Sequence, residues 1–378
     1  MYNYSIVIPL HVNKDGRTEH YMNKRKKITI YDIAEATGFS ITTVTRALNH
    51  KGRINEDTRR LIMETADKLG YRANPAAQGL SRKPIKLGAI FYCPVEEYLD
   101  DIYRGVAVAA HELRQYNVEI DLRSIPYTNP RECCAKASEL LQEFHTKHYD
   151  GVLLTPSAII AEPDILCEPI AKMAEDGIPV VTIVDDIPKS KRMFHVGIDA
   201  FTAGKMAAEL LSLTSVGRDV AILTHSAQTD IHQRYLDGFA HVAGKDTFRS
   251  VRIYSHYDDP EQVLKQTEQM LRDNPDLHGV YITSASSPLA CRQILASGRS
   301  GLNIVTTDLL DETPALLSDH TALATIYQDP YRQGKTAAML LYDYLLNKKN
   351  FANHLITPIV VLSSNYACYR DWKDVNNT

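Results

Sequence analysis

The sequence has little that would suit a membrane, an oxidising compartment or a zinc site. Its 378 residues contain no apolar run that approaches the length of a membrane span. Residues 6–10 are apolar, but this stretch is too short for a signal peptide and no basic residue precedes it. None of the six cysteines shows CxxC spacing, and adjacent Cys133 and Cys134 cannot easily bridge to each other. We therefore expect a reduced, cytoplasmic protein with no metal.

The sequence also lacks the common catalytic motifs. It contains no Gly-x-Ser-x-Gly elbow, no Walker loop and no His-Glu-x-x-His. His225, His232 and His241 lie near Ser226 in the chain, but no pattern pairs a nucleophile with a base. We predict no catalytic residue and no cofactor. His225 follows a predicted strand, where we expect a polar loop residue, with a place in a binding cleft as the alternative.

Charge is distributed unevenly along the chain. Residues 24–83 contain thirteen Lys/Arg and six Asp/Glu, a balance of +7, although the whole chain carries -4. Residues 1–23 are neutral, so residues 84–378 carry about -11. A basic segment of this kind is suited to contact with phosphate, and a solvated basic face is the alternative interpretation.

The basic segment contains the start and stop signals of three short helices. Thr29, with Asp32 three positions later, predicts the first N-terminus, and a glycine turn follows at Gly38. Asn55 predicts the start of the third helix, and Gly70 its end.

The helix between these two has two distinct faces. Ser40 can cap it, and its residues Val44, Ala47 and Leu48 recur at spacings of three and four, which predicts a buried face. Its opposite face carries short hydroxyl-bearing or methyl-bearing groups and one guanidinium, a set that suits base edges in a major groove. These residues are Ile41, Thr42, Thr45 and Arg46.

Helix, glycine turn and helix form the helix-turn-helix pattern. Three motifs follow in fixed order: Thr-Val-Thr-Arg-Ala-Leu-Asn at 43–49, Arg-Ile-Asn at 53–55 and Leu-Gly-Tyr-Arg-Ala-Asn-Pro at 69–75. On these motifs the chain resembles the lactose-repressor family of bacterial transcription regulators, from about Lys27 to the C-terminus. Met22 and the basic residues after it look like the family's usual start, so we expect Met22 to be the natural start.

The resemblance implies a domain order. An extension at 1–27, for which we expect disorder, precedes an all-α helix-turn-helix headpiece at 28–73. A hinge helix follows at 74–84. Residues 85–378 then form a two-lobed α/β domain of the periplasmic-binding-protein type with parallel sheets, which binds ligand and dimerises.

In the family, the hinge helix folds only when two copies pair over the centre of the operator, and a leucine of each enters the minor groove. Leu80 matches that leucine, and an apolar wedge of this kind bends DNA. A flexible linker with a loosely packed leucine is the alternative. The residues we expect at the DNA are Thr29, Ser40, Ile41, Thr42, Thr45, Arg46, Asn49, Asn74, Ala77 and Leu80.

Continuous apolar stretches beyond Lys86 predict strands buried on both faces, and so parallel sheets flanked by helices. Ligands bind at the carboxyl ends of such strands. Carboxylates there with an aromatic ring suit a polyhydroxylated ligand, although each acidic residue has an alternative role as a helix cap or a solvated loop charge. The expected ligand residues are Tyr98 in the loop after the first strand, Ser157, Asp185, Arg234, Asp308 and Gln328.

Two departures from the family concern this cleft. Many members carry an arginine where Tyr235 stands here, and Arg234 is displaced by one position. Many also carry an Asn-Asp pair where this chain has serines and an alanine at 284–287. We expect a local shift at the helix start to let Arg234 reach the site.

Together these features predict a homodimeric, ligand-responsive regulator without enzymatic activity. Its expected role is to repress genes for uptake or use of a carbohydrate or polyol, by binding a near-palindromic operator in double-stranded DNA. One alternative is a regulator that a ligand or phosphocarrier protein activates as a corepressor. Another is a cytoplasmic sugar-binding module with a vestigial headpiece. Residues 368–378 lack a leucine heptad, which favours a dimer over a tetramer.

Overall fold

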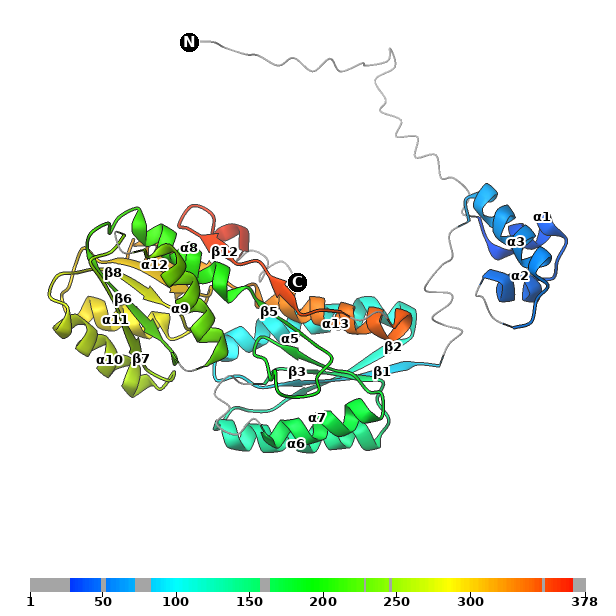
Figure 1. Cartoon of the computed structure of the whole chain (residues 1–378), viewed down its shortest axis with the longest axis horizontal. Coiled ribbons are helices and arrows are strands. Elements are labelled where there is room, and N and C mark those ends of the chain that lie inside the picture. The colour runs from blue at the N-terminus through cyan, green and yellow to red at the C-terminus, as the bar shows by residue number, and fades with distance from the viewer. Residues whose placement is uncertain are drawn as a thin grey trace, which may run out of the picture. The chain divides into compact units, whose positions relative to one another are not determined.

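The computed structural model describes residues 28–48, 52–71, 83–156, 164–227, 229–244, 247–348 and 351–369. The chain divides into two compact units, Met1–Gln78 and Gly79–Thr378 (Figure 1). No helix in the described ranges is long and apolar enough to cross a membrane.

The first unit contains three helices, α1 (Ile30–Thr37), α2 (Ile41–Leu48) and α3 (Glu56–Leu69). The positive φ of Gly38, 72°, allows the sharp turn between the first two helices. At the end of α3, Gly70 adopts a similar φ of 70°. The helices pack around a small apolar core that contains Ile33, Val44, Ala47, Ile62 and Ala66. Val44 and Ala47 lie on the face of α2 that the spacing predicts to be buried.

The second unit has two lobes, each built on a six-stranded sheet (Figure 1). The sheet of the first lobe has the order β11-β5-β4-β3-β1-β2, and all of its strand pairs are parallel. Helices α5 and α13 pack on one face and α6 and α7 on the other. The bounds are β1 (Ile85–Phe91), α5 (Glu96–Leu113), the 3-10 turn η1 (Arg114–Tyr116), β2 (Val118–Ser124), α6 (Pro130–Thr146), β3 (Gly151–Leu154), α7 (Asp164–Glu175), β4 (Val180–Ile183), β5 (Phe194–Ile198), α13 (Pro330–Asn347) and β11 (His354–Ile356).

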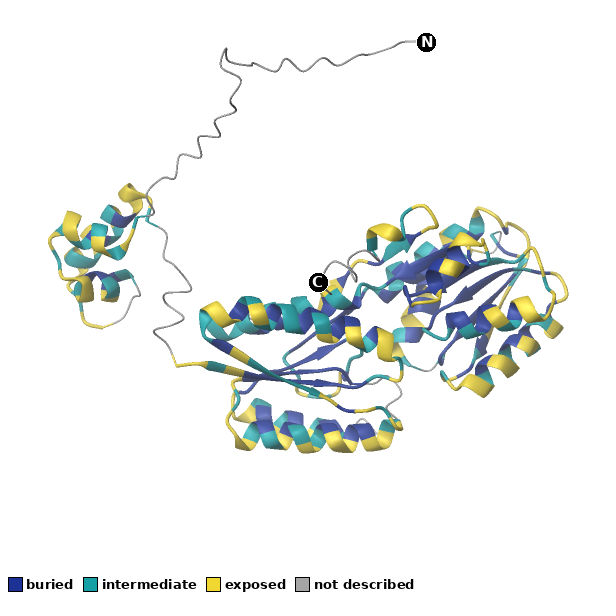
Figure 2. Cartoon of the chain, turned by 180° about the vertical axis from the view of Figure 1, so that it is seen from behind, coloured by how far each residue is buried: buried dark blue, intermediate teal, exposed yellow. Residues whose placement is uncertain are grey.

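The second lobe repeats this plan, with strand order β12-β10-β9-β8-β6-β7. Helices α8 and α9 cover one face of the sheet, and α10 and α11 the other. Figure 2 shows the central strands of both lobes buried between helices whose outer faces are exposed, while the edge strands β2 and β7 are mostly half-buried or exposed. The bounds are α8 (Ala200–Ser212), β6 (Asp219–Thr224), α9 (Asp230–Val242), β7 (Ser250–Ser255), α10 (Pro260–Asp273), β8 (Leu277–Ile282), α11 (Ser287–Ala296), β9 (Asn303–Thr307), α12 (Thr313–Ser318), β10 (Ala324–Tyr327) and β12 (Ile359–Val361).

The chain crosses between the lobes three times, after β5, after β10 and after β11. The expected parallel sheets are confirmed with one exception, because the short β12 returns antiparallel to β10. Paired glycines bring the helices next to the crossings close together. A Cβ on Gly105 of α5 would overlap the carbonyl oxygen of Tyr331 on α13, and a Cβ on Gly334 would overlap that of Ile102.

Candidate functional site

The exposed surface of α2 is the first candidate site. The Ser40 hydroxyl accepts a hydrogen bond from the Thr43 backbone N–H at 3.2 Å, so the predicted cap is present. Ile41, Thr42 and Arg46 are exposed, while Thr45 is half-buried. With Val44 and Ala47 turned into the core, this surface is free to face another molecule.

The start of α1 also follows the sequence prediction. The Thr29 backbone N–H donates to the Asp32 carboxylate at 2.7 Å, and the Thr29 hydroxyl donates to the same oxygen at 2.6 Å. These bonds satisfy groups that a helix terminus would otherwise leave unpaired. Four other predicted DNA contacts, Asn49, Asn74, Ala77 and Leu80, lie outside the described residues, as does most of the predicted hinge helix.

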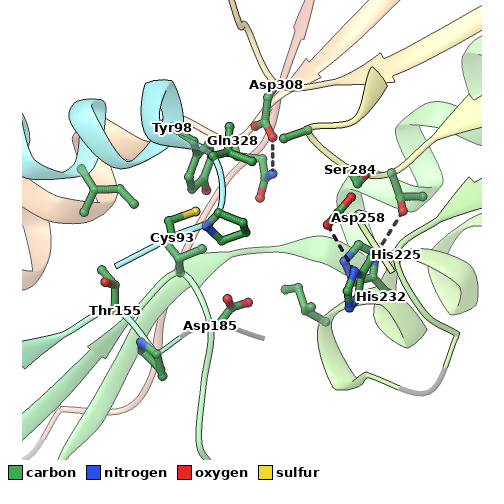
Figure 3. A pocket seen from close by; sticks show the side chains of 18 of the residues that line it. Cys93, Tyr98, Thr155, Asp185, His225, His232, Asp258, Ser284, Asp308 and Gln328 are labelled. Atoms are coloured by element: carbon green, nitrogen blue, oxygen red, sulfur yellow. Dashed lines mark hydrogen bonds and ion pairs between the residues drawn. The ribbon is translucent and has the colours of Figure 1, made fainter. Parts of the chain in front are cut away.

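The second candidate site is a cavity between the lobes, which we call the cleft. Its volume is about 110 Å³, and its walls are the residues that follow the strands of both sheets (Figure 3). Tyr92, Thr155 and Asp185 come from the first lobe. His225 and Asp308 come from the second. Their position agrees with the rule that parallel sheets bind ligands at the carboxyl ends of their strands.

Asp308 is the most unusual side chain of the cleft. It lies directly after β9, is only 3% exposed and has a φ of 71°. Its backbone N–H donates to the Ile326 carbonyl at 3.0 Å, and its own carbonyl accepts from the Thr325 hydroxyl at 2.6 Å. These bonds hold a left-handed backbone that a non-glycine residue rarely adopts, so the direction of the side chain is fixed.

The two carboxylate oxygens of Asp308 differ in their surroundings. Oδ2 accepts a hydrogen bond from the Gln328 side-chain amide at 3.0 Å, and the Gln328 oxygen accepts one from the Tyr235 hydroxyl, also at 3.0 Å. Oδ1 is buried and has no hydrogen-bond partner among the described residues. Burial raises the pKa of Asp308 to about 7, against a smaller opposing effect of the Gln328 hydrogen bond. A residue that lines the cleft thus has one carboxylate oxygen without a partner in the described part of the chain.

A second acidic side chain, Asp258, follows β7 and is surrounded by partners. His225 Nδ1 lies 3.2 Å from its Oδ2, and the Ser286 hydroxyl donates to its Oδ1 at 2.7 Å. His256 Nδ1 lies 3.5 Å from Oδ1 on the other side. Burial acts to raise the pKa of Asp258, but the close approach of His225, the neighbouring His256 and the Ser286 hydrogen bond outweigh it and hold the pKa below its usual range. Asp258 is therefore an ionised group with a polar partner at each of its two oxygens.

His232 is a neutral part of the wall. Its Nδ1 lies 3.0 Å from both the Thr224 and Thr283 hydroxyls, and burial lowers its pKa to about 3. His225 is also buried, at 2% exposure, and it lines the cleft. The expectation of a plain polar loop residue at His225 was therefore wrong, because the turn after β6 folds inward over Asp258.

The first lobe contributes an aromatic ring and an acid. Tyr98 lies in the first turns of α5 rather than in a loop as expected, since Glu96 and Glu97 favour the N-terminus of a helix. Its hydroxyl lies 3.5 Å from the Gln333 amide nitrogen, which is in position to donate to it. Asp185 lines the cleft, whereas neighbouring Asp186 is bound through both oxygens by Arg192 at 2.5 and 2.6 Å.

The two other predicted ligand residues are Ser157 and Arg234. Ser157 lies outside the described residues, so its prediction stays a prediction. Arg234 is exposed on α9, and Tyr235 lines the cavity in its place. Consecutive helix residues point about 100° apart, so a one-position displacement turns the guanidinium away instead of being absorbed locally. Among the described residues, no group of three His, Cys, Asp or Glu is arranged to hold a metal.

Comparisons with known proteins match a family to each of the two parts of the chain. Residues 29–74 match the family described as "Bacterial regulatory proteins, lacI family", and residues 89–349 match a periplasmic binding protein domain. The chain is 24% identical to catabolite control protein A of Priestia megaterium, over 87% of this chain and 96% of that protein. It is 25% identical to the ribose operon repressor of Bacillus subtilis, over 83% and 90% respectively.

The fold has close structural counterparts. A glucose-galactose binding protein from Geobacillus stearothermophilus superimposes with a TM-score of 0.63 at 23% identity, covering 75% of this chain and 99% of the other. At this identity the match supports the fold alone, and the ligand has to be argued from the side chains of the cleft.

Proposed function

The chain belongs to the lactose-repressor family of bacterial transcription regulators, and from that premise we propose that it represses genes in response to a carbohydrate or polyol. The observation that carries the ligand part is the buried Asp308 oxygen without a donor, in a cleft that Tyr98 also lines. A sugar hydroxyl supplies the missing donor, and the apolar face of a sugar packs on a tyrosine ring.

Two regulators named among the relatives support the carbohydrate assignment. One is a catabolite control protein and the other a repressor of a ribose operon. The proposal assigns the cleft to binding rather than to catalysis, and it locates the protein in the cytoplasm, where the DNA is.

The signal passes from the cleft to the headpiece through the movement of the lobes. Glu97 at the start of α5 accepts a hydrogen bond from the Asp311 backbone N–H at 2.8 Å, so the lobes touch across the cleft. Ligand that bridges Asp308 and Tyr98 favours the closed arrangement. For ligand to act as a switch it must bind the two arrangements with different affinity.

DNA binding uses two copies of the chain. Two α2 surfaces read two half-sites of a near-palindrome, with Arg46 at base edges, and the Leu80 wedges bend the centre. Leu80→Ala should lower affinity and reduce bending together, as measured by the mobility of circularly permuted DNA fragments. A variant with weaker binding but unchanged bending would refute the wedge.

Fluorescence anisotropy of labelled DNA tests the function as a whole. The probe is the intergenic DNA upstream of the protein's own gene, at roughly 150 mM salt with nonspecific competitor. We expect the full chain to bind this DNA specifically and to release it when a sugar or polyol is added. DNA binding that the ligand strengthens would indicate a corepressor response. Failure to bind any upstream sequence would indicate a vestigial headpiece and refute the regulatory function.

A further inference from the structure

The charges that line the cleft are almost all negative. The described lining residues include Asp185, Asp258 and Asp308 but neither lysine nor arginine. Figure 3 shows the three carboxylates approaching one central space from different elements of the two lobes. Residues 157–163 and 228, which lie outside the described ranges, contain no lysine or arginine in their sequence.

The arginines that could balance this charge are committed elsewhere or turned away. Arg192 is bound through two hydrogen bonds to Asp186, and Arg104 is paired with Asp101 at 2.7 Å. Arg234 is exposed. Among the described residues, a ligand that enters the cleft therefore meets no arginine or lysine in its wall, so phosphate and carboxylate groups are disfavoured.

Asp308 has fewer partners than Asp258. Asp258 has His225, His256 and the Ser286 hydroxyl beside its oxygens, whereas the charges of Asp101 and Asp258 raise the pKa of Asp308 beyond the effect of burial. Its Oδ1 is buried in the wall and has no donor. The Cys93 thiol reports the same negative surroundings, because burial and then the charges of all three cleft carboxylates raise its pKa to about 12.

We propose that the preferred ligand is a polyhydroxylated amine, an amino sugar or an aminopolyol, whose ammonium group pairs with Asp308. An ammonium group donates to Oδ1 and neutralises a carboxylate that burial otherwise disfavours. The Tyr98 and Tyr235 rings line the same cleft and tolerate a cation against their faces. This proposal rests on the proposed function, because it names the ligand class of the same cleft.

Matched probes separate the charge from the shape of the ligand. The full chain is titrated by calorimetry at pH 7.5 with a hexosamine, its parent hexose and the hexose 6-phosphate, in gluco and galacto forms. A second set contains a 1-amino-1-deoxyhexitol, its parent hexitol and the hexitol phosphate. We expect an amine to bind about 10- to 100-fold more tightly than its neutral parent, the gain expected of a charged hydrogen bond.

Variants then test the assignment to Asp308. Asp308→Asn keeps the side-chain shape and should reduce the preference for the amine by about tenfold or more. Asp185→Asn, in the facing wall, should reduce it by a smaller factor. Asp237→Asn changes an exposed carboxylate on α9 outside the cleft and should leave the preference unchanged.

Three results would refute the amine proposal. The first is that the neutral parent or the phosphate binds as tightly as the amine, and the second is that Asp308→Asn leaves the preference for the amine unchanged. The third is that no amine binds with a Kd below roughly 1 mM. If a neutral sugar binds the protein and causes it to release DNA, the amine proposal is wrong but the proposed regulatory function holds. If an amine binds a protein that does not bind its upstream DNA, the proposed regulatory function is wrong but the ligand class holds.

Discussion

Replacing Asp308 by asparagine should make the second unit more stable at pH 8 and less stable at pH 4. The folded-state pKa of Asp308 is raised to about 7 from an ordinary 3.8. Between these two values the folded protein keeps a proton that the unfolded chain releases. The wild-type stability therefore falls as pH rises through this window, and it levels off above about pH 7. Asparagine does not titrate, so the variant lacks this loss.

The size of the effect follows from the two pKa values. Their difference is roughly three units, and each unit corresponds to 1.36 kcal/mol, so ionised Asp308 costs about 4 kcal/mol. The asparagine oxygen can take the Gln328 hydrogen bond, but its amide nitrogen then lies where Oδ1 lacks a partner. An unsatisfied buried donor costs about 1–3 kcal/mol at every pH. The variant should thus gain on the order of 1–3 kcal/mol at pH 8 and lose a similar amount at pH 4.

Unfolding by urea, followed by circular dichroism in steps from pH 4 to pH 8, measures this change. The two lobes need not unfold together, so the comparison uses the difference between variant and wild type at each pH. Asp237→Asn, which changes an exposed carboxylate outside the cleft, is the matched control. A stability difference for Asp308→Asn that stays flat from pH 4 to pH 8 would refute the claim that burial raises the pKa of this carboxyl.

Three further predictions concern helix α2 and the packing of α5 against α13. Arg46→Ala should weaken specific DNA binding about 10- to 100-fold and nonspecific binding much less, whereas Lys83→Ala should weaken both, as anisotropy at several salt concentrations can measure. Ser40→Ala removes the cap of α2 and should lower the stability of the headpiece by about 1 kcal/mol, measured as its melting transition in the full chain. Gly105→Ala forces a Cβ against α13 and should cost about 1–3 kcal/mol in chemical unfolding, whereas Gly244→Ala has open space and should not.

The headpiece could be predicted closely because its signals are local. Ser40 and Asn55 cap helices through bonds to residues two or three positions away, and Gly38 and Gly70 end helices through their own φ angles. The buried face of α2 follows from spacing alone. None of these features depends on a distant part of the chain, so the sequence contains the whole argument.

The far wall of the cleft could not be predicted in the same way. Asp258 and His256 follow β7, an edge strand whose residues are mostly exposed or half-buried, and so it lacks the continuous apolar run that marks the other strands. Ser284 and Ser286 were noted only as replacements for an Asn-Asp pair. Their role depends on the approach of the turn after β8 to the turn after β7, a contact between residues 28 positions apart.

The tyrosine at position 235 links the fold to the charge of the cleft. An arginine at this position, the residue expected from the family resemblance, would bring a positive charge toward the carboxylate and lower its pKa. The Tyr235 hydroxyl instead donates its one hydrogen to Gln328, whose amide turns to Asp308 Oδ2. This chain of neutral bonds satisfies one oxygen and leaves the other without a donor. With a tyrosine at position 235, the wall has no fixed cation there, so a proton or the ligand must neutralise Asp308.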